Sequence, residues 1–464
     1  MPYYPKLRFR ANDSVKTRAK KQRVIDRIRI LRQALNQHFA SSRDHTQQFG
    51  TAKIATWNLR EFGKKNYGGR SFEELYYIAE IIAQFDLVAL QEIRSDLTEF
   101  RELKSILGPQ WDFIATDVTD GKAGNDERMV FLFDRNKAQF KNIAGELTLR
   151  ESSKVQAFFG ERINLENGIV LDLHSQDLSG IYKASTKTQK GEIVLNEDLE
   201  IPIEGSCQLT LPEGCYLAIK KGTKISRPKR GHAQIQLDKG LIQGDNYAIR
   251  LPEGSFDDSL KQFARTPFLL SFQLGWLKLN LCTVHIYYGS SSNKQKLKQR
   301  EQEIALLTEA LANKAEREFA ADKESFMGVL GDFNIIGKDH STMQALEANG
   351  FEIPEKLKKI PGSNVAKDKA YDQIAFWAPG TRTTDYSKLE VVGANVFDFF
   401  EYVFTLGDEE IYRKEGTRYN GLKSSTNYKQ WRTYKMSDHL PMWVEVSNDF
   451  SESYLRHIES SIPR

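Results

Sequence analysis

The chain has 464 residues, 40% of them hydrophobic and 28% charged, with a net charge of +4. This length exceeds one compact core, so we expect a large domain with an insertion or a second domain. The composition is typical of a soluble globular protein, and no apolar run of about 18 residues predicts a membrane span. The N-terminus lacks the pattern of a secretory signal, and the three cysteines have neither metal-ligand spacing nor an even count. We therefore expect a cytoplasmic protein.

The N-terminal segment is strongly basic. Residues 1–32 contain eleven Lys or Arg, against two acidic residues, Asp13 and Asp26. Within residues 14–38 apolar side chains recur at helical spacing, at Val24, Ile28, Leu31 and Leu35. This pattern predicts an amphipathic helix that docks one face on the rest of the protein. Its basic residues predict either an arm that binds a polyanion or a solvated helix face.

Short apolar runs along the chain predict strands, and several of these runs end in polar residues. The expected strands cover residues 51–58, 86–92, 129–133, two parts of 269–285, 326–330, 371–377 and 442–446. Residues 73–84 and 294–318 have the spacing of amphipathic helices.

Residues 152–259 differ in character, because short β-like runs alternate with Pro and Gly turns. We expect a small all-β insertion, either a sandwich, a barrel or a solenoid, that emerges on a loop and extends a substrate groove or binds a partner. Six of the eleven residues from 220 to 230 are basic. They predict either contact with a nucleic-acid backbone or a solvated hairpin.

Oxygen-donor side chains gather at the expected strand ends. They are Asn58, Glu92, Asp332, Asn334 and Asp438. Taken singly, each is better explained by a turn or a helix cap. Together, with no competing Cys or paired-His pattern, they favour Mg²⁺, Mn²⁺ or Ca²⁺ over zinc.

Two histidines have similar settings, His285 after an apolar run and His439 after Asp438. A pair of imidazoles supplies a base for a water molecule and an acid for a leaving oxygen. Each imidazole needs a carboxylate to fix its tautomer. A cation, an amide donor and an imidazolium would stabilise the charge that develops on a phosphorus centre. The residues thus indicate hydrolysis of a phosphate ester.

Seven segments together carry a family resemblance. They are TWN (56–58), LQE (90–92), NDERMVFLFD (125–134), TVHIYYG (283–289), GDFN (331–334), AYDQI (370–374) and SDHLP (437–441). In this order they resemble the endonuclease/exonuclease/phosphatase superfamily, over residues 50–150 and 264–447. The resemblance implies the DNase I-like fold, an α/β sandwich of four layers in which helices flank two mostly antiparallel β-sheets.

The resemblance also implies roles for individual residues. Glu92 would be the principal metal ligand, with Asn58 and Asp438 beside the cation. Asp332 and Asn334 would bind the scissile phosphate, and Asp332 would also position the metal and the water.

The two histidines and Arg128 complete the implied site. His439 would be a catalytic imidazole oriented by Asp372. His285 would be its counterpart across the phosphate, oriented by Glu127. Arg128 would contact phosphate.

Three departures narrow the branch of the family. His285 stands where abasic-site repair enzymes usually have tyrosine, so the chain is similar to the DNase I-like branch. Residues 370–373 read AYDQ where inositol-phosphate phosphatases have Trp-Cys-Asp-Arg, which disfavours a lipid phosphatase. Secreted nucleases of this branch have disulfides and a signal peptide, so an intracellular, bacterial-type member is implied.

The sequence therefore predicts a Mg²⁺-dependent phosphodiesterase, with Mn²⁺ or Ca²⁺ as alternatives, acting as an endonuclease or exonuclease on DNA rather than RNA. The alternatives are a phosphomonoesterase or lipid phosphodiesterase of the same fold, or a non-catalytic binding protein. We expect nucleic acid to contact the N-terminal arm and residues 220–230. The expected parts are an arm (1–48), a catalytic domain (49–151 and 260–448), the insertion (152–259) and a tail (449–464).

Overall fold

The computed structural model divides into two units, one formed by Met1–Thr148 with Phe263–Arg464 and the other by Leu149–Gln262. In the first unit it describes residues 2–40, 50–119, 126–148, 263, 265–288, 294–322, 325–378, 388–416 and 420–462, and in the second unit eight strands. No helix within these described residues has the length and apolar character needed to cross a bilayer.

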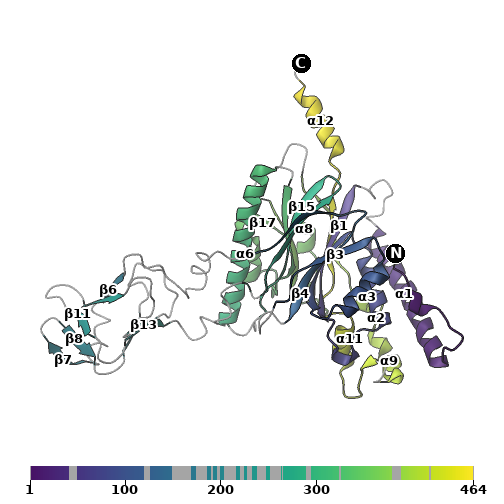
Figure 1. Ribbon diagram of the computed structural model, residues 1–464, viewed down its shortest axis with the longest axis horizontal. Coiled ribbons are helices and arrows are strands. Elements are labelled where there is room, and N and C mark those ends of the chain that lie inside the picture. The colour runs from purple at the N-terminus through teal and green to yellow at the C-terminus, as the bar shows by residue number, and fades with distance from the viewer. Residues whose placement is uncertain are drawn as a thin grey trace. The chain divides into compact units, whose positions relative to one another are not determined.

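The first unit contains two six-stranded sheets (Figure 1). The first sheet has the order β19 (Val391–Val396), β20 (Met442–Ser447), β1 (Thr51–Phe62), β2 (Leu87–Arg94), β4 (Glu127–Asp134), β3 (Trp111–Ala115). The second has the order β17 (Phe351–Glu352), β18 (Asp372–Trp377), β16 (Ser325–Asp332), β15 (Leu277–His285), β14 (Phe268–Leu274), β5 (Gln139–Glu146).

Each sheet has one parallel pair at its centre, and its four other pairings are antiparallel. The parallel pairs are β1 with β2 and β15 with β16. Strands β2, β15 and β16 are buried at almost every position, as expected for strands covered on both faces. Between the sheets, the Gln91 side-chain amide donates to Thr283 Oγ1 at 2.9 Å, which joins a strand of one sheet to a strand of the other.

Helices cover the outer face of each sheet (Figure 1). On the first sheet these are α1 (Val15–His38), α2 (Phe72–Ile82) and α3 (Thr98–Leu107), which share one apolar core with β1 and β2. On the second sheet α6 (Lys294–Ala321) packs on β16 and on α7 (Ser341–Glu347). The predicted four-layer α/β sandwich is thus confirmed.

Shorter elements complete the first unit. The helices are α8 (Glu355–Lys358), α9 (Glu409–Glu415), α11 (Tyr428–Lys435) and α12 (Ser451–Ser461). The 3-10 turns are η1 (Pro5–Leu7), η3 (Asn66–Gly68), η4 (Ala348–Gly350), η5 (Phe399–Glu401) and η6 (Leu406–Asp408).

Both the apolar and the basic residues of the N-terminal helix α1 fix it to the domain. Ser14 caps its first turn, and the four apolar residues that predicted the helix are buried in the core of the first sheet. Its basic residues form ion pairs with the body of the domain: Arg23 with Glu73 and Glu415, Arg27 with Asp408, and Arg32 with Glu80. A large share of the basic charge therefore holds the helix in place. Lys16, Arg18 and Arg29 remain exposed.

In the second unit every element that the structure describes is a strand. One sheet has the order β13 (Tyr247–Arg250), β10 (Tyr216–Ile219), β9 (Leu199–Pro202), and the other β6 (Ile169–Leu173), β12 (Ala233–Leu237), β11 (Lys224–Ser226), β8 (Glu192–Leu195), β7 (Ser185–Gln189). All pairings are antiparallel. This agrees with the predicted all-β insertion. Of the basic stretch 220–230, residues 224–226 form β11, and the others lie outside the described residues.

His38, at the end of α1, provides a test of how this helix is packed. Trp443 Nε1 donates a hydrogen bond of 3.0 Å to His38 Nε2, which must therefore carry no proton. The rings of Phe39 and Phe397 lie 4.9 and 5.1 Å from the imidazole. Burial lowers the pKa of His38.

We expect His38 to make the protein less stable as the pH falls below about 6.5, the pKa of an unfolded histidine. Because its folded pKa is lowered, the unfolded chain binds the proton more readily, and the stability present above this pH is lost below it. Urea unfolding followed by tryptophan fluorescence between pH 8 and pH 5 measures the slope. His38→Gln keeps an acceptor for Trp443 but does not titrate, so its stability should fall less steeply. Equal slopes for the two proteins would contradict the prediction.

Candidate active site

Polar side chains from both sheets meet where the central parallel strands end. His285 and Asp332 are the last residues of β15 and β16 and are register partners. Asp372, the first residue of β18, is the partner of Asp332 on its other side. Asn58 and Glu92 occupy the carboxyl-terminal parts of β1 and β2. The carboxyl ends of parallel strands lie at the same edge of a sheet, which brings these residues together.

Asp332 lies at the centre of the cluster. Its Oδ2 accepts a hydrogen bond of 3.0 Å from the Asn58 side-chain amide. The same oxygen lies 3.6 Å from His285 Nε2 and 3.7 Å from His439 Nε2. Its Oδ1 accepts a bond of 2.9 Å from the Asn334 backbone N–H. Since Asp332 is only 2% exposed, these neighbours define its surroundings.

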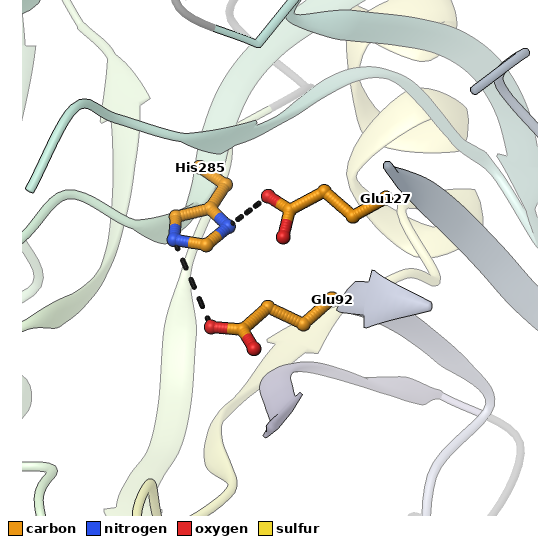
Figure 2. Close-up of side chains that lie close together, drawn as sticks. All are labelled: Glu92, Glu127 and His285. Atoms are coloured by element: carbon orange, nitrogen blue, oxygen red, sulfur yellow. Dashed lines mark ion pairs between the residues drawn. The ribbon is translucent and has the colours of Figure 1, made fainter. Parts of the chain in front are cut away.

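His285 lies between two carboxylates (Figure 2). Its Nδ1 is 2.6 Å from Glu127 Oε1, and its Nε2 is 4.0 Å from Glu92 Oε1. Arg265 also forms an ion pair with Glu127. Burial and Arg265 lower the pKa of His285, but Glu127 and Asp332 outweigh them and raise it. Glu127 therefore fixes the ring and favours its charged form.

His439 has the equivalent arrangement from the other side. Its Nδ1 is 2.8 Å from Asp372 Oδ2. Its backbone N–H donates to Ser437 Oγ at 3.0 Å, and its carbonyl accepts from Trp57 Nε1 at 2.9 Å. Burial opposes the charged imidazole, yet Asp372 and Asp332 hold the pKa of His439 well above its usual range.

Glu92 is held as a charged carboxylate. Burial alone would raise its pKa, but His285 and hydrogen bonds from Asn58 (3.0 Å) and the Glu61 backbone (2.7 Å) lower the pKa of Glu92 to about 2. Its backbone φ is +60°, a left-handed conformation that is strained for this residue type. Such strain is concentrated at functional sites.

The donor set fits a hard divalent cation. Two groups of acids with a histidine lie within reach of an ion: Glu92, Glu127 and His285, and Asp332, Asp372 and His439. In each group one carboxylate is paired with a histidine Nδ1 atom, Glu127 with His285 and Asp372 with His439. Within the two groups, the carboxylates of Glu92 and Asp332 have no such pairing with Nδ1. Both accept from the Asn58 amide, so their carboxylates lie close together and a cation would offset their repulsion. Oxygen donors of this kind suit Mg²⁺, Mn²⁺ or Ca²⁺.

Asp438 and Asn334 belong to the same neighbourhood. Asp438 Oδ2 forms an ion pair of 3.1 Å with Arg60, and its side chain is 41% exposed, which keeps it accessible to an ion. The Asn334 side-chain amide donates to the Ile286 carbonyl at 2.8 Å, so it binds the chain just beyond β15.

Arg128 departs from its predicted place. Its Nη1 donates to the Thr116 carbonyl at 2.8 Å and pairs with Asp117 at 3.3 Å. Both partners lie just after β3. Successive side chains of a strand point to opposite faces, so Glu127 on β4 faces His285 and the next residue turns away. The contact of Arg128 with phosphate therefore stays a prediction, and the bonds to Thr116 and Asp117 do not support it.

The first residue of the GDFN motif, Gly331, must be a glycine for steric reasons. Its φ is +146°, and a Cβ at this position would lie 2.1 Å from the Val284 carbonyl oxygen. A side chain would push β16 away from β15 and displace Asp332, the next residue.

Two buried arginines support the site, and the sequence did not reveal them. Arg70 donates to the carbonyls of Leu59 (2.6 Å) and Met436 (3.0 Å), and it reaches Arg60 and Lys435 in the same way. It thereby joins the end of β1 to the segment just before Ser437.

Arg300 likewise joins two backbone segments, here at the second sheet. It donates to the carbonyls of Asn334 (2.6 Å) and Tyr287 (3.1 Å), which joins the chain beyond β16 to the chain beyond β15. It is 1% exposed, although it lies on the charged helix α6. An arginine among polar neighbours in the sequence is indistinguishable from a solvated one, so no sequence signal identifies either residue.

Comparison with known proteins gives structural neighbours at low identity. No family model matches the chain, and no curated protein matches it. Solved structures similar to it include a humanized D. rerio TDP2 with 14 mutations (10% identity, 86% of this chain and 99% of that chain, TM-score 0.39). Others are the human Nocturnin catalytic domain (11%, 86% and 93%, TM-score 0.38) and an endonuclease/exonuclease/phosphatase from Bacteroides vulgatus (11%, 86% and 99%, TM-score 0.38). The description of the fold rests on the two sheets themselves.

We expect Arg70→Met to lower the free energy of unfolding by about 3 kcal/mol, because buried carbonyls lose a charged hydrogen-bond donor. Urea unfolding at neutral pH measures the change. Arg135→Met is the matched control: Arg135 also donates to a carbonyl, that of Pro109, but from an exposed position. The control should change stability by less than about 0.5 kcal/mol. Equal losses for the two variants would show that Arg70 has no special role.

Proposed function

We propose that this chain is a divalent-metal-dependent phosphodiesterase, a nuclease that hydrolyses DNA by attack of water on phosphorus. One observation carries the proposal. The Nε2 atoms of His285 and His439 both face Asp332 Oδ2, at 3.6 and 3.7 Å, while their Nδ1 atoms are paired with separate carboxylates.

This geometry suits the demands of phosphodiester hydrolysis. The reaction needs a base that takes a proton from water and groups that stabilise the charge developing on the phosphoryl oxygens. Two imidazoles with independently fixed tautomers present two Nε2 atoms to one small space. A single His–carboxylate pair would supply one of these functions but not both.

The roles follow from the hydrogen bonds. In its neutral form His439 donates from Nδ1 to Asp372 and accepts at Nε2 a proton from a water molecule that Asp332 orients. Because Asp372 and Asp332 raise the pKa of His439, the share of this neutral form grows as the pH rises. The protonated form of His439 is then stabilised by Asp372. His285, kept positively charged by Glu127, donates from Nε2 to a phosphoryl oxygen. Asn58 holds Asp332 and Glu92 at fixed positions on either side of its amide.

Glu92, Asn58 and Asp438 are the residues that would hold the divalent cation. When bound, the cation neutralises negative charge on the phosphate group and its oxygens. The charged state of Glu92, with its pKa at about 2, prepares this site at neutral pH.

The choice of DNA rests on the resemblance of seven motifs to the DNase I-like branch, with His285 in place of tyrosine. In the N-terminal arm, the exposed basic residues of α1 would contact phosphate groups of the substrate. They are Lys16, Arg18 and Arg29. Contacts from residues 220–230 remain part of the proposal. RNA, phosphomonoesters and phospholipids are the competing substrates that experiments must separate.

Assays on plasmid, single-stranded DNA, RNA and phosphoinositides, each with Mg²⁺, Mn²⁺ or EDTA, test the function. We expect metal-dependent cleavage of DNA, and a loss of about 100- to 10,000-fold in kcat for Asp332→Asn and His439→Ala. Asp26→Asn, at an exposed position on α1, is the control and should be fully active. Phosphate release from a lipid without cleavage of nucleic acid would replace the proposal with a phosphatase. Inactivity of the intact protein on every substrate would indicate a binding protein.

The assignment of Glu92 to the cation is tested by its amide variant. Glu92→Gln keeps the shape of the side chain but removes its charge, so the Mg²⁺ concentration for half-maximal activity should rise by at least about tenfold. Glu61→Gln is the matched control, because the Glu61 carboxylate pairs with Arg94 and Lys64. Calorimetric titration with Mn²⁺ gives a second reading that does not depend on turnover. An unchanged metal requirement in Glu92→Gln would rule out the assignment.

A further inference from the structure

Two tyrosines beside the cluster have no part in the proposed chemistry. Tyr371 immediately precedes Asp372, and its ring centre lies 5.6 Å from that of His439, with 32° between the planes. Burial, together with Tyr288 and Asp332, raises the pKa of Tyr371 to about 12, so its hydroxyl keeps its proton. Tyr288 is thus one of the groups close to this hydroxyl. Tyr371 therefore lies between the catalytic imidazole on one contact and the neighbourhood of Tyr288 on another.

Tyr288 is exposed although it stands three residues after His285. Its exposed fraction is 56%, which is high for a large aromatic residue next to a buried site. The guanidinium carbon of Arg300 lies 5.6 Å from the centre of its ring. Arg300 is itself fixed by its bonds to the carbonyls of Asn334 and Tyr287. The ring of Tyr288 therefore lies against a guanidinium that is itself fixed, and more than half of the residue stays open to solvent.

An exposed aromatic ring that lies against a fixed guanidinium suits stacking with a planar group. Exposure of apolar ring surface is unfavourable in water, and a stacked partner removes that surface from it. A guanidinium close to the ring strengthens such a surface through cation–π attraction. Among phosphate esters, nucleic acids carry a flat base beside each phosphate, whereas phosphoinositides and sugar phosphates do not.

We propose that Tyr288 forms a stacking subsite for the nucleobase next to the scissile phosphate. The inference rests on the proposed nuclease function and deepens it, because it assigns part of the substrate recognition to a base rather than to the phosphate backbone. Stacking on an aromatic side chain is tolerant of base identity, so the subsite gives affinity without sequence preference.

Two single-stranded oligodeoxynucleotides test the subsite. In each, one phosphodiester is cleavable and its neighbours are methylphosphonates. The first has normal bases, and the second has abasic residues on both sides of the cleavable bond. We expect Tyr288→Ala to lower kcat/KM for the first by about 5- to 150-fold, the range of one stacked base, and to leave the second unchanged. Tyr288→Phe should restore the first substrate, whereas Tyr288→Leu, which keeps apolar bulk, should not.

Trp276→Ala is the matched control. Trp276 is also an exposed aromatic residue, at 44%, and it lies at the opposite end of β15 from His285. It should change neither substrate. Equal losses on the two oligonucleotides in Tyr288→Ala would show a purely structural role and overturn the base subsite while the nuclease function stands. Failure of the intact protein to cleave either oligonucleotide, with plasmid also uncut, would overturn the nuclease function and the subsite with it.

Discussion

One amide group joins the two sheets at the site. Asn58 Nδ2 donates to Glu92 on β2 and to Asp332 on β16, each at 3.0 Å. Two buried carboxylates repel each other, and a neutral donor placed between them reduces that cost without cancelling either charge. Glu92 therefore keeps the negative charge that a divalent cation needs. Asn58 Oδ1 in turn accepts the Arg60 backbone N–H, so the amide cannot rotate away. The amide thereby sets the spacing between the carboxylates of Glu92 and Asp332.

The two sheets position the polar side chains of the site in the same way. Each sheet has one parallel pair at its centre, and the ends of both pairs deliver the polar side chains. A buried arginine then ties the loops beyond each pair together through backbone carbonyls, Arg70 in the first half and Arg300 in the second. Carbonyl partners are uncharged, so these arginines fix the backbone without competing for the carboxylates of the site.

Much of the site could be predicted because it follows from strand ends. Polar residues directly after buried runs, such as Asn58 and Asp332, are expected at strand ends, and the structure brings these strand ends together. Pairing could not be predicted, since β19 and β20 join the first sheet from far along the chain and hydrophobic pattern alone does not specify a partner. For Arg128, the sequence did not reveal the direction of the side chain. The sequence places it beside Glu127, but alternation along β4 sends the two side chains to opposite faces.

The role of the basic residues in the N-terminal segment could not be predicted from the sequence either. Eleven basic residues in 32 indicate a polyanion-binding arm as well as they indicate a docked helix. The acidic partners of Arg23, Arg27 and Arg32 lie between 48 and 392 residues away, where no local pattern could reveal them. An arginine that is paired in this way is not available to a phosphate backbone unless an ion pair breaks. Recognition of a substrate would therefore depend less on these paired arginines than on the exposed basic residues and on the groups at the site itself. Those groups are the two imidazoles, the cation that Glu92 would hold and the open ring of Tyr288.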